Sequence, residues 1–376
     1  MALTNFGLLT TEQKTIWSMD LWKQARNFSF INKFLGAGPN SLVQHVTELK
    51  KSEKGARAVI TLLADLEGDG IAGDRTLEGN EEQMKTYDQV IRVDQLRHAN
   101  RIEGRMADQK SIVEFRNNSK NVLAYWMSDR IDQMAFLTMA GVGYQYTNNA
   151  VGTARTGSDL QFLEFAADVT APTSKRYGRW NVTTAPTAPT IDWGTGTSTV
   201  LATDLISWKM FIQMKAYARD HYIRPVVENG GEETYHCFMT PGTMGRLKMD
   251  ADYMANLRYA QPRSDANALF SGTSVKIDGI YLHEFRHVPN TRLSPNGSKW
   301  GGTTNVDGSC VLFCGAQALG MADLGNPEWN EEEFDYGNQV GISVGKILGY
   351  KKPVFYSQYE KSTEDFGTLV VYVGGV

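Results

Sequence analysis

Two regions in the first half of the chain differ in the spacing of their hydrophobic residues. Residues 56–66 and 84–102 are rich in β-branched and apolar side chains that partly alternate with polar ones, which is typical of β-strands. From residue 108 to residue 141 the apolar positions instead recur every three or four residues, which predicts one long helix. At 1.5 Å per residue this helix would be about 45–50 Å long. The pattern therefore predicts two strands around a long tip, followed by a strut-like helix.

The rest of the chain predicts a mixture of strands and helices. Residues 142–200 are rich in Gly, Thr, Ala and Pro, which predicts an irregular insertion. A helix is predicted to begin near Thr203 or Asp204 and to end before Pro225. Residues 235–260 predict a strand, a Pro-Gly turn and a helix. Further strands are predicted within 274–290, within 310–319 and in three runs after residue 339. These elements predict an α+β fold with mixed sheets, and the sequence shows no internal repeat and no βαβ nucleotide signature.

The first 50 residues predict an N-terminal arm rather than a domain. A short amphipathic helix is expected to start at Thr11 and to reach about Asn27, before Gly and Pro interrupt the pattern over 34–41. Trp17 and Trp22 lie on this helix, and two exposed tryptophans need a surface to pack against. The sequence leaves open whether that surface is on the same subunit or on another.

Composition excludes several classes of protein. The chain has 376 residues, a net charge of −4 and three cysteines. These totals show no basic excess for binding duplex DNA, and the cysteines are too few for a disulfide framework. We expect no signal peptide and no membrane span, because the N-terminus lacks a basic region followed by an apolar one and no run of about 18 apolar residues occurs. The protein is therefore expected to fold in the cytosol.

The tip between the two strands resembles the start of a calcium loop. Asp65 to Gly70 has the acidic spacing, and Gly70 falls at the sixth loop position. A calcium loop needs a bidentate Glu at the twelfth position, which here is Thr76. We therefore expect no specific calcium site, and no cofactor is predicted anywhere in the chain.

A second motif resembles a zinc peptidase site. His283, Glu284 and His287 match the H-E-x-x-H pattern, in which both histidines bind zinc from one helix face and the glutamate acts as general base. The surrounding sequence predicts a strand, in which residues four apart are separated by roughly 13 Å and cannot share a metal. A zinc-dependent hydrolase is therefore the less favoured alternative function, and no catalytic residue is predicted.

The charges around the tip predict contacts between subunits. The tip is acidic, and it is followed along the chain by regularly placed arginines. Complementary patches of this kind set register and choice of partner in a repeated interface. The alternative interpretation is a solvated loop. The predicted contact residues are Trp17, Trp22, Asp69, Asp74, Arg75, Glu78, Glu81, Glu82, Arg92, Arg97 and Arg101.

The order of these parts resembles the HK97-type fold of tailed-phage major capsid proteins. Residues of about 40–141 are similar to the N4-like major capsid family, whereas the C-terminal half matches only in layout and 142–200 not at all. The segments that carry the similarity are LADLEGDGIAGDRTLEGNEE (63–82), VIRVDQLRHA (90–99) and MADQKSIVEFRNNSKNVLAYWMSDRIDQ (106–133).

The resemblance implies a domain organisation. The expected parts are an N-terminal arm (1–49), an extended β-hairpin called the E-loop (50–105), a peripheral domain (106–200) with a spine helix (108–141) and the insertion (142–200), an axial domain (201–330), and C-terminal strands that return to the peripheral domain (331–376).

The resemblance also implies a function and partners. It implies a structural protein, not an enzyme, that assembles in the host cytoplasm as pentamers and hexamers into the icosahedral shell of a virion. Scaffolding and portal proteins, a decoration protein in some phages, and double-stranded DNA contacted on the inner face without sequence specificity are the implied partners. Because encapsulin compartments share this fold, an encapsulin-like shell is an alternative.

Overall fold

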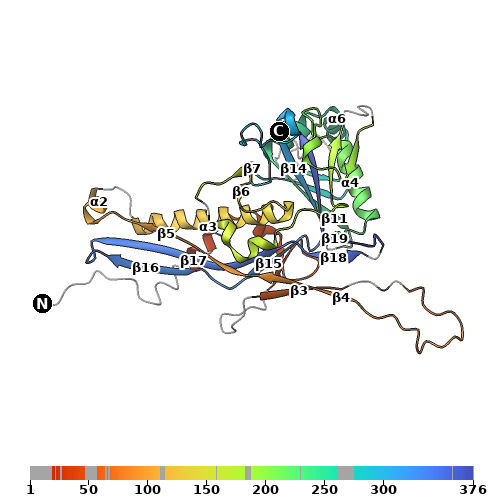
Figure 1. Cartoon of the computed structure of the whole chain (residues 1–376), viewed down its shortest axis with the longest axis horizontal. Helices are drawn as coiled ribbons and strands as arrows, with labels where there is room; N and C mark the ends of the chain where they lie inside the picture. The colour runs from red at the N-terminus through yellow and green to blue at the C-terminus, as the bar shows by residue number, and fades with distance from the viewer. Residues whose placement is uncertain are drawn as a thin grey trace.

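The computed structural model describes residues 19–21, 23–25, 28–46, 57–63, 66, 68–110, 115–157, 159–182, 188–228, 230–260, 275–357 and 359–375. Figure 1 shows a long, flat body, a compact part that rises from one end of it, and a two-stranded extension that projects beyond the body. No helix among the described residues has the length and apolar content needed to cross a membrane.

The centre of the long body is helix α3 (Phe115–Ala140). Its 26 residues correspond to about 39 Å. The helix ends in a Schellman motif at Gly141, which has φ of +68°: the Val142 N–H bonds the Leu137 carbonyl at 2.9 Å and the Gly141 N–H bonds the Thr138 carbonyl at 3.1 Å.

The predicted single helix over 108–141 is wrong at its N-terminal end. A separate short helix, α2 (Arg105–Lys110), precedes α3 and is drawn at the far end of the body in Figure 1. Met106, the one large apolar side chain of α2, is 67% exposed, so it does not pack α2 against α3.

A six-stranded sheet packs against α3. The long strand β17 (Gln339–Lys351) lies at its centre and pairs with three others, and apolar side chains of α3 such as Met127 and Ile131 share one core with Ile342 and Val344 of β17. The other strands are β1 (Leu35–Gly36), β2 (Val43–Val46), β5 (Asp94–Arg101), β15 (Leu319–Asp323) and β16 (Glu328–Phe334).

The compact part is built on an eight-stranded sheet with helices on one face. The strand order is β12-β13-β11-β14-β20-β8-β9, with β10 paired to β11. The strands are β8 (Tyr177–Asn181), β9 (Thr190–Trp193), β10 (Val226–Val227), β11 (Glu233–Met239), β12 (Val275–Ile277), β13 (Ile280–Glu284), β14 (Gly308–Cys314) and β20 (Thr368–Gly374), and the helices are α4 (Trp208–Asp220), α5 (Pro241–Met249) and α6 (Ala251–Ala260).

Short elements connect these two sheets. The hairpin of β6 (Tyr146–Thr147) and β7 (Ala150–Ala154) follows α3, and the hairpin of β18 (Val354–Ser357) and β19 (Ser362–Asp365) precedes β20. The 3-10 turns are η1 (Ile31–Phe34), η2 (Leu160–Phe162), η3 (Glu164–Asp168), η4 (Thr197–Thr199) and η5 (Gly302–Thr304).

The predicted strand pair around the tip is confirmed as the antiparallel β3 (Arg57–Leu63) and β4 (Thr86–Arg92). The second predicted strand, 84–102, is however two strands, because β5 pairs with β17 of the six-stranded sheet and not with β3. Their base is anchored, because Ile60 and Ile91 pack in a small core with Ala322 of β15. Pairing stops at Leu63 and Thr86, and the chain beyond them forms the projecting end of the extension in Figure 1.

The sheets cut across the expected domain boundaries. Strands β8 and β9 of the supposedly irregular segment 142–200 form a hairpin at the edge of the eight-stranded sheet. Strand β15, expected in an axial domain over 201–330, belongs to the six-stranded sheet, and β20 of the C-terminal segment 331–376 lies inside the eight-stranded one. The pairings of β15 with β2 and of β20 with β8 join segments far apart in sequence, so local patterns do not reveal them.

Two further elements differ from expectation. Helix α4 begins at Trp208 rather than near Asp204, because the buried Asp204 carboxylate instead accepts hydrogen bonds from the Leu201 N–H at 2.8 Å and the Arg179 Nε at 2.7 Å. The predicted strand over 274–290 is a hairpin of β12 and β13, whose two turn residues, Asp278 and Gly279, both have positive φ as a type I′ turn requires.

Candidate contact surfaces

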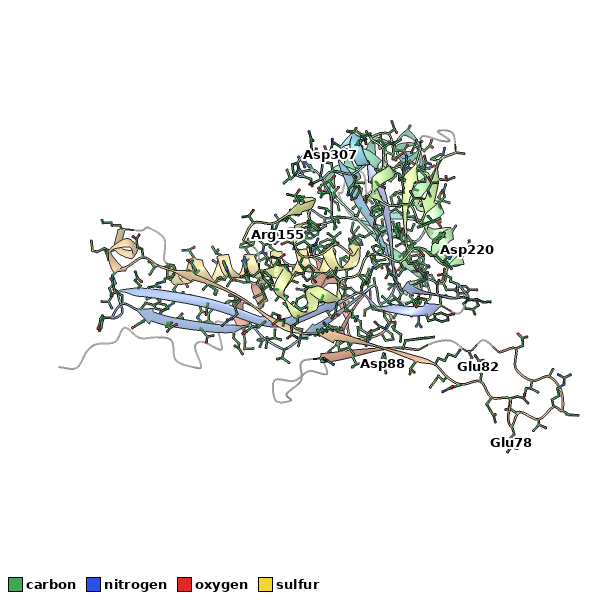
Figure 2. The ribbon with its side chains drawn as sticks, in the orientation of Figure 1. Glu78, Glu82, Asp88, Arg155, Asp220 and Asp307 are labelled. Atoms are coloured by element: carbon green, nitrogen blue, oxygen red, sulfur yellow. The ribbon has the colours of Figure 1, made fainter. Side chains whose placement is uncertain are left out.

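The tip of the extension exposes both charged and apolar side chains. Asp69, Asp74, Arg75, Glu78, Glu81 and Glu82 are all exposed. The apolar residues Leu66, Leu77 and Met84 are 64%, 63% and 62% exposed. Figure 2 shows Glu78 and Glu82 on the part of the chain that extends beyond the body. A thin extension with this mixture of side chains has the character of a surface that becomes buried against a partner.

The tip takes its shape from local hydrogen bonds. The Gly68 N–H donates to Glu82 at 2.6 Å, and the Gly79 N–H donates to Glu81 at 2.7 Å. The Asn80 N–H closes a turn on the Leu77 carbonyl at 3.0 Å. Two of the predicted contact carboxylates therefore also hold the loop, which sequence spacing alone does not reveal.

Apart from Arg75, which is in the tip itself, the predicted arginines lie along the body and not beside the tip of their own subunit. Arg92 forms an ion pair with Asp168 at 3.8 Å, and Arg101 lies over the Phe334 ring at 4.1 Å and hydrogen-bonds Gln339. Arg97 is exposed on β5, where its side chain lies against Gly345 of β17. A contact between these arginines and the acidic tip stays a prediction about two copies of the chain.

The described part of the N-terminal arm packs on its own subunit, since Leu21 and Ala25 are fully buried in the core around α3. Trp17 and Trp22 lie outside the described residues. The Phe30 ring stacks on Phe285 at 4.3 Å, and Phe34 meets the edges of His236 and His283 at 5.4 and 5.0 Å. Sequence reasoning missed this aromatic cluster, although the alternating aromatic and histidine residues of β11 and β13 were its signal.

The zinc-peptidase motif is not helical: His283 and Glu284 end strand β13 and His287 lies in the turn that follows, in agreement with the predicted strand, and the three side chains have separate partners. His283 Nε2 lies 2.9 Å from His236 Nδ1, whereas His287 Nε2 lies 2.7 Å from the Asp129 carboxylate. Glu284 forms an ion pair with Lys248 at 3.8 Å. Burial lowers the pKa of both His236 and His283 to about 4. Within the ranges that the structure describes, no three His, Cys, Asp or Glu side chains are placed to hold a metal ion.

Comparison with known proteins identifies the family. The model of the phage capsid protein family matches residues 5–374. The chain is 55% identical over 371 residues to the major capsid protein of Pseudomonas phage KPP25, which covers 98% of this chain and 97% of the relative.

Solved structures confirm the fold. The capsid of Ralstonia phage GP4 matches with a TM-score of 0.72 at 24% identity, over 92% of this chain and 91% of that one. The Cyanophage Pam1 capsid asymmetric unit matches with a TM-score of 0.67 at 19% identity, over 99% of both chains. The α+β, HK97-type capsid fold expected from the sequence is therefore confirmed, while the closer similarity to the N4-like family stays a prediction. With a family match across nearly the whole chain, this protein belongs to the phage capsid protein family.

Proposed function

We propose that this chain is the major capsid protein whose copies assemble, as pentamers and hexamers, into the icosahedral shell of a tailed phage. The observation that carries this proposal is the 55% identity to a phage major capsid protein over 98% of the chain. The role is structural, and no catalytic step is assigned to the protein.

The projecting tip supports this role physically. Its exposed leucines and methionine can be buried only by contact with another molecule. Each side chain of this size that is fully buried stabilises such a contact by roughly 1.5–3 kcal/mol. Its carboxylates would add ion pairs worth about 0–1 kcal/mol each, so they set register rather than overall stability. Interlocking extensions repeated around a closed shell would multiply these small contributions.

Further partners follow from the same role. Scaffolding and portal proteins direct assembly in the host cytoplasm, and a decoration protein is a further candidate for the outer surface. Double-stranded DNA is the proposed content, contacted without sequence specificity on the inner face. No membrane takes part in the proposed cycle.

The content of the particles tests this proposal. Particles purified after expression with the phage's own assembly proteins should sediment as large, uniform species, and particles from infection should carry nuclease-resistant double-stranded DNA. Particles that instead contain one co-assembled protein cargo and no nucleic acid would indicate an encapsulin-like compartment and would contradict the proposed genome shell.

A further inference from the structure

Four arginines gather on the side of α3 that carries the β6–β7 hairpin. They are Arg130 on α3, Arg155 directly after β7, and Arg286 and Arg292 in the segment after β13, and we call them the arginine surface. Arg286 and Arg292 line the same hollow of about 330 Å³, together with Asn149, Asn290 and the start of α5 at Thr240. Although the whole chain has a net charge of −4, the fold concentrates positive charge here.

The negative charge within this group is too small to balance it. Asp129 forms ion pairs with Arg286 at 2.5 Å and with Arg130 at 3.7 Å, and it is hydrogen-bonded to His287 Nε2 at 2.7 Å. The hydrogen bond from His287, together with these nearby charges, lowers the pKa of Asp129 to about 2. One carboxylate therefore serves two arginines and a histidine, and it stays ionised at neutral pH.

Arg155 adds a further positive charge, and one of its N–H donors has no partner. Its Nε donates to the Tyr146 carbonyl at 3.1 Å, but its buried Nη2 has no hydrogen-bond partner. Burial lowers the pKa of Arg155 to about 10, so the guanidinium is still charged at neutral pH. A buried charged donor that lacks a partner is costly unless a bound group completes its hydrogen bonds.

The backbone around the arginine surface is fixed in advance. The β6–β7 hairpin and the segment after β13 are joined by three backbone hydrogen bonds, from Asn290 to Asn148 at 2.7 Å, from Leu293 to Asn149 at 2.8 Å and from Val151 to Asn290 at 3.1 Å. The arginines therefore project from a preformed framework, which lowers the entropy that binding must overcome.

We infer that the arginine surface binds the phosphates of duplex DNA on the inner face of the shell, independently of base sequence; this inference rests on the proposed function. Guanidinium groups match phosphate oxygens bidentately and keep their charge. The N-terminus of α5, at the edge of the hollow, also favours a negatively charged ligand.

The main competing ligand is the acidic tip of a neighbouring subunit. Figure 2 shows Arg155 on one side of the long body and Glu78, Glu82 and Asp88 on the other. Copies related by rotation in a ring meet through two different sides, so the tip of one copy can approach the opposite side of the next. Glu81 and Glu82 of the tip, however, already accept hydrogen bonds from the Gly79 and Gly68 N–H groups of their own loop. The phosphates of DNA have no such internal partners, which favours DNA, and the peptide in the test below decides between the two ligands.

The test uses full-length protein below its assembly concentration and a fluorescent random-sequence duplex, with binding measured by anisotropy at several salt concentrations. The double variant Arg286→Gln with Arg292→Gln should reduce the slope of log K against log salt by about 2, and adding Arg155→Gln should remove about 1 more, because each lost phosphate contact contributes about 0.9. If Arg155→Gln impairs folding, the double variant alone still tests the inference.

The matched control is Arg219→Gln with Arg224→Gln, two exposed arginines elsewhere in the compact part, which should leave the slope unchanged. Equal slopes for variant and control would overturn the inference. The inference would also be overturned if a peptide of residues 68–82 bound the wild type but not the double variant, while both proteins bound the duplex equally. Electron microscopy of the same protein separates the two proposals. If particles form but the arginine variants bind DNA as the wild type does, only this inference is contradicted. If the protein binds DNA but forms no particles, the proposed function is contradicted.

Discussion

The Ser29 hydroxyl donates a hydrogen bond of 2.7 Å to the buried carboxylate of Asp132, and this bond joins the N-terminal arm to helix α3. The same carboxylate accepts hydrogen bonds from the backbone N–H groups of Phe30 at 2.8 Å and Ile31 at 3.0 Å. One side chain of the long helix thus satisfies three donors at the point where the arm turns into η1. The arm is therefore held by a specific polar site as well as by its aromatic contacts.

Replacing Asp132 should loosen the arm and lower stability. We expect Asp132→Ala to reduce the free energy of unfolding by about 2–4 kcal/mol, because two buried donors and one partly buried donor lose their acceptor. Asp132→Asn, which keeps one acceptor oxygen, should lose less. Urea denaturation of the unassembled subunit measures both, with Asp88→Ala at an exposed position of β4 as the control. The account of this site fails if Asp132→Ala and Asp88→Ala are equally stable.

The His236–His283 pair should make the subunit sensitive to acid. Burial lowers the pKa of each ring from 6.5 to about 4, so between these values the unfolded chain binds protons that the folded chain does not. Stability should therefore fall as the pH drops from about 6.5 to 4, and protonated rings 2.9 Å apart would also disturb the Phe34 contact.

Unfolding midpoints in urea at pH 4.5, 5.5 and 7 measure this effect. His283→Gln keeps a hydrogen-bonding group but removes one titrating ring, so it should flatten the pH dependence. His98→Gln makes the same change at an exposed position and serves as the control. A pH dependence that is the same in both variants would show that the pair is not its source.

Gly141 should be intolerant of any side chain. A Cβ there would lie 2.4 Å from the Thr170 carbonyl oxygen, and the φ of +68° is itself unfavourable for other residues. We expect Gly141→Ala to cost about 2–4 kcal/mol, from strained backbone and a forced shift at the end of α3. Gly157 has the same φ with no atom within 4 Å, so Gly157→Ala should cost only about 1 kcal/mol. Thermal or urea unfolding that ranks the two variants equally would contradict the steric argument.

Reversing the tip charges should impair assembly and leave the fold intact. The triple change of Glu78, Glu81 and Glu82 to Lys also removes the two hydrogen bonds within the tip, but all three side chains are exposed and lie outside the cores, so circular dichroism and the melting temperature should be nearly unchanged. Particle yield, measured by sedimentation, should fall severalfold because the interface charges no longer match.

The control for the tip is the reversal of Asp220, Glu232 and Asp252, which makes the same change in net charge on the compact part. It should leave the particle yield close to that of the wild type. A normal yield from the tip variant would remove the tip carboxylates from the subunit interface.

Much of the fold was predictable because it depends on local pattern. The strand pair around the tip, the helix that ends at Gly141 and the strand carrying His283 all follow from periodicity and from glycine placement. The acidic composition of the tip also indicated a projecting loop. Its own hydrogen bonds, such as Gly68 to Glu82, depend on a turn geometry that spacing does not specify.

The remaining features depend on contacts between distant segments. The parallel pairing of β20 with β8 joins Val370 to Tyr177, and no local pattern indicates it. Asp129 and Arg286 are likewise 157 positions apart, so the arginine surface exists only after folding. The net charge of −4 suggested no basic face, because it sums the local positive surface with acidic residues elsewhere, including the tip.

Electron microscopy of the expressed full-length protein, alone and with the phage's assembly proteins, tests the central claim most directly. The account predicts closed, icosahedral particles in which the tip of each subunit lies against a neighbouring copy. Protein that stays strictly monomeric under every assembly condition would contradict the claim that this chain builds the shell.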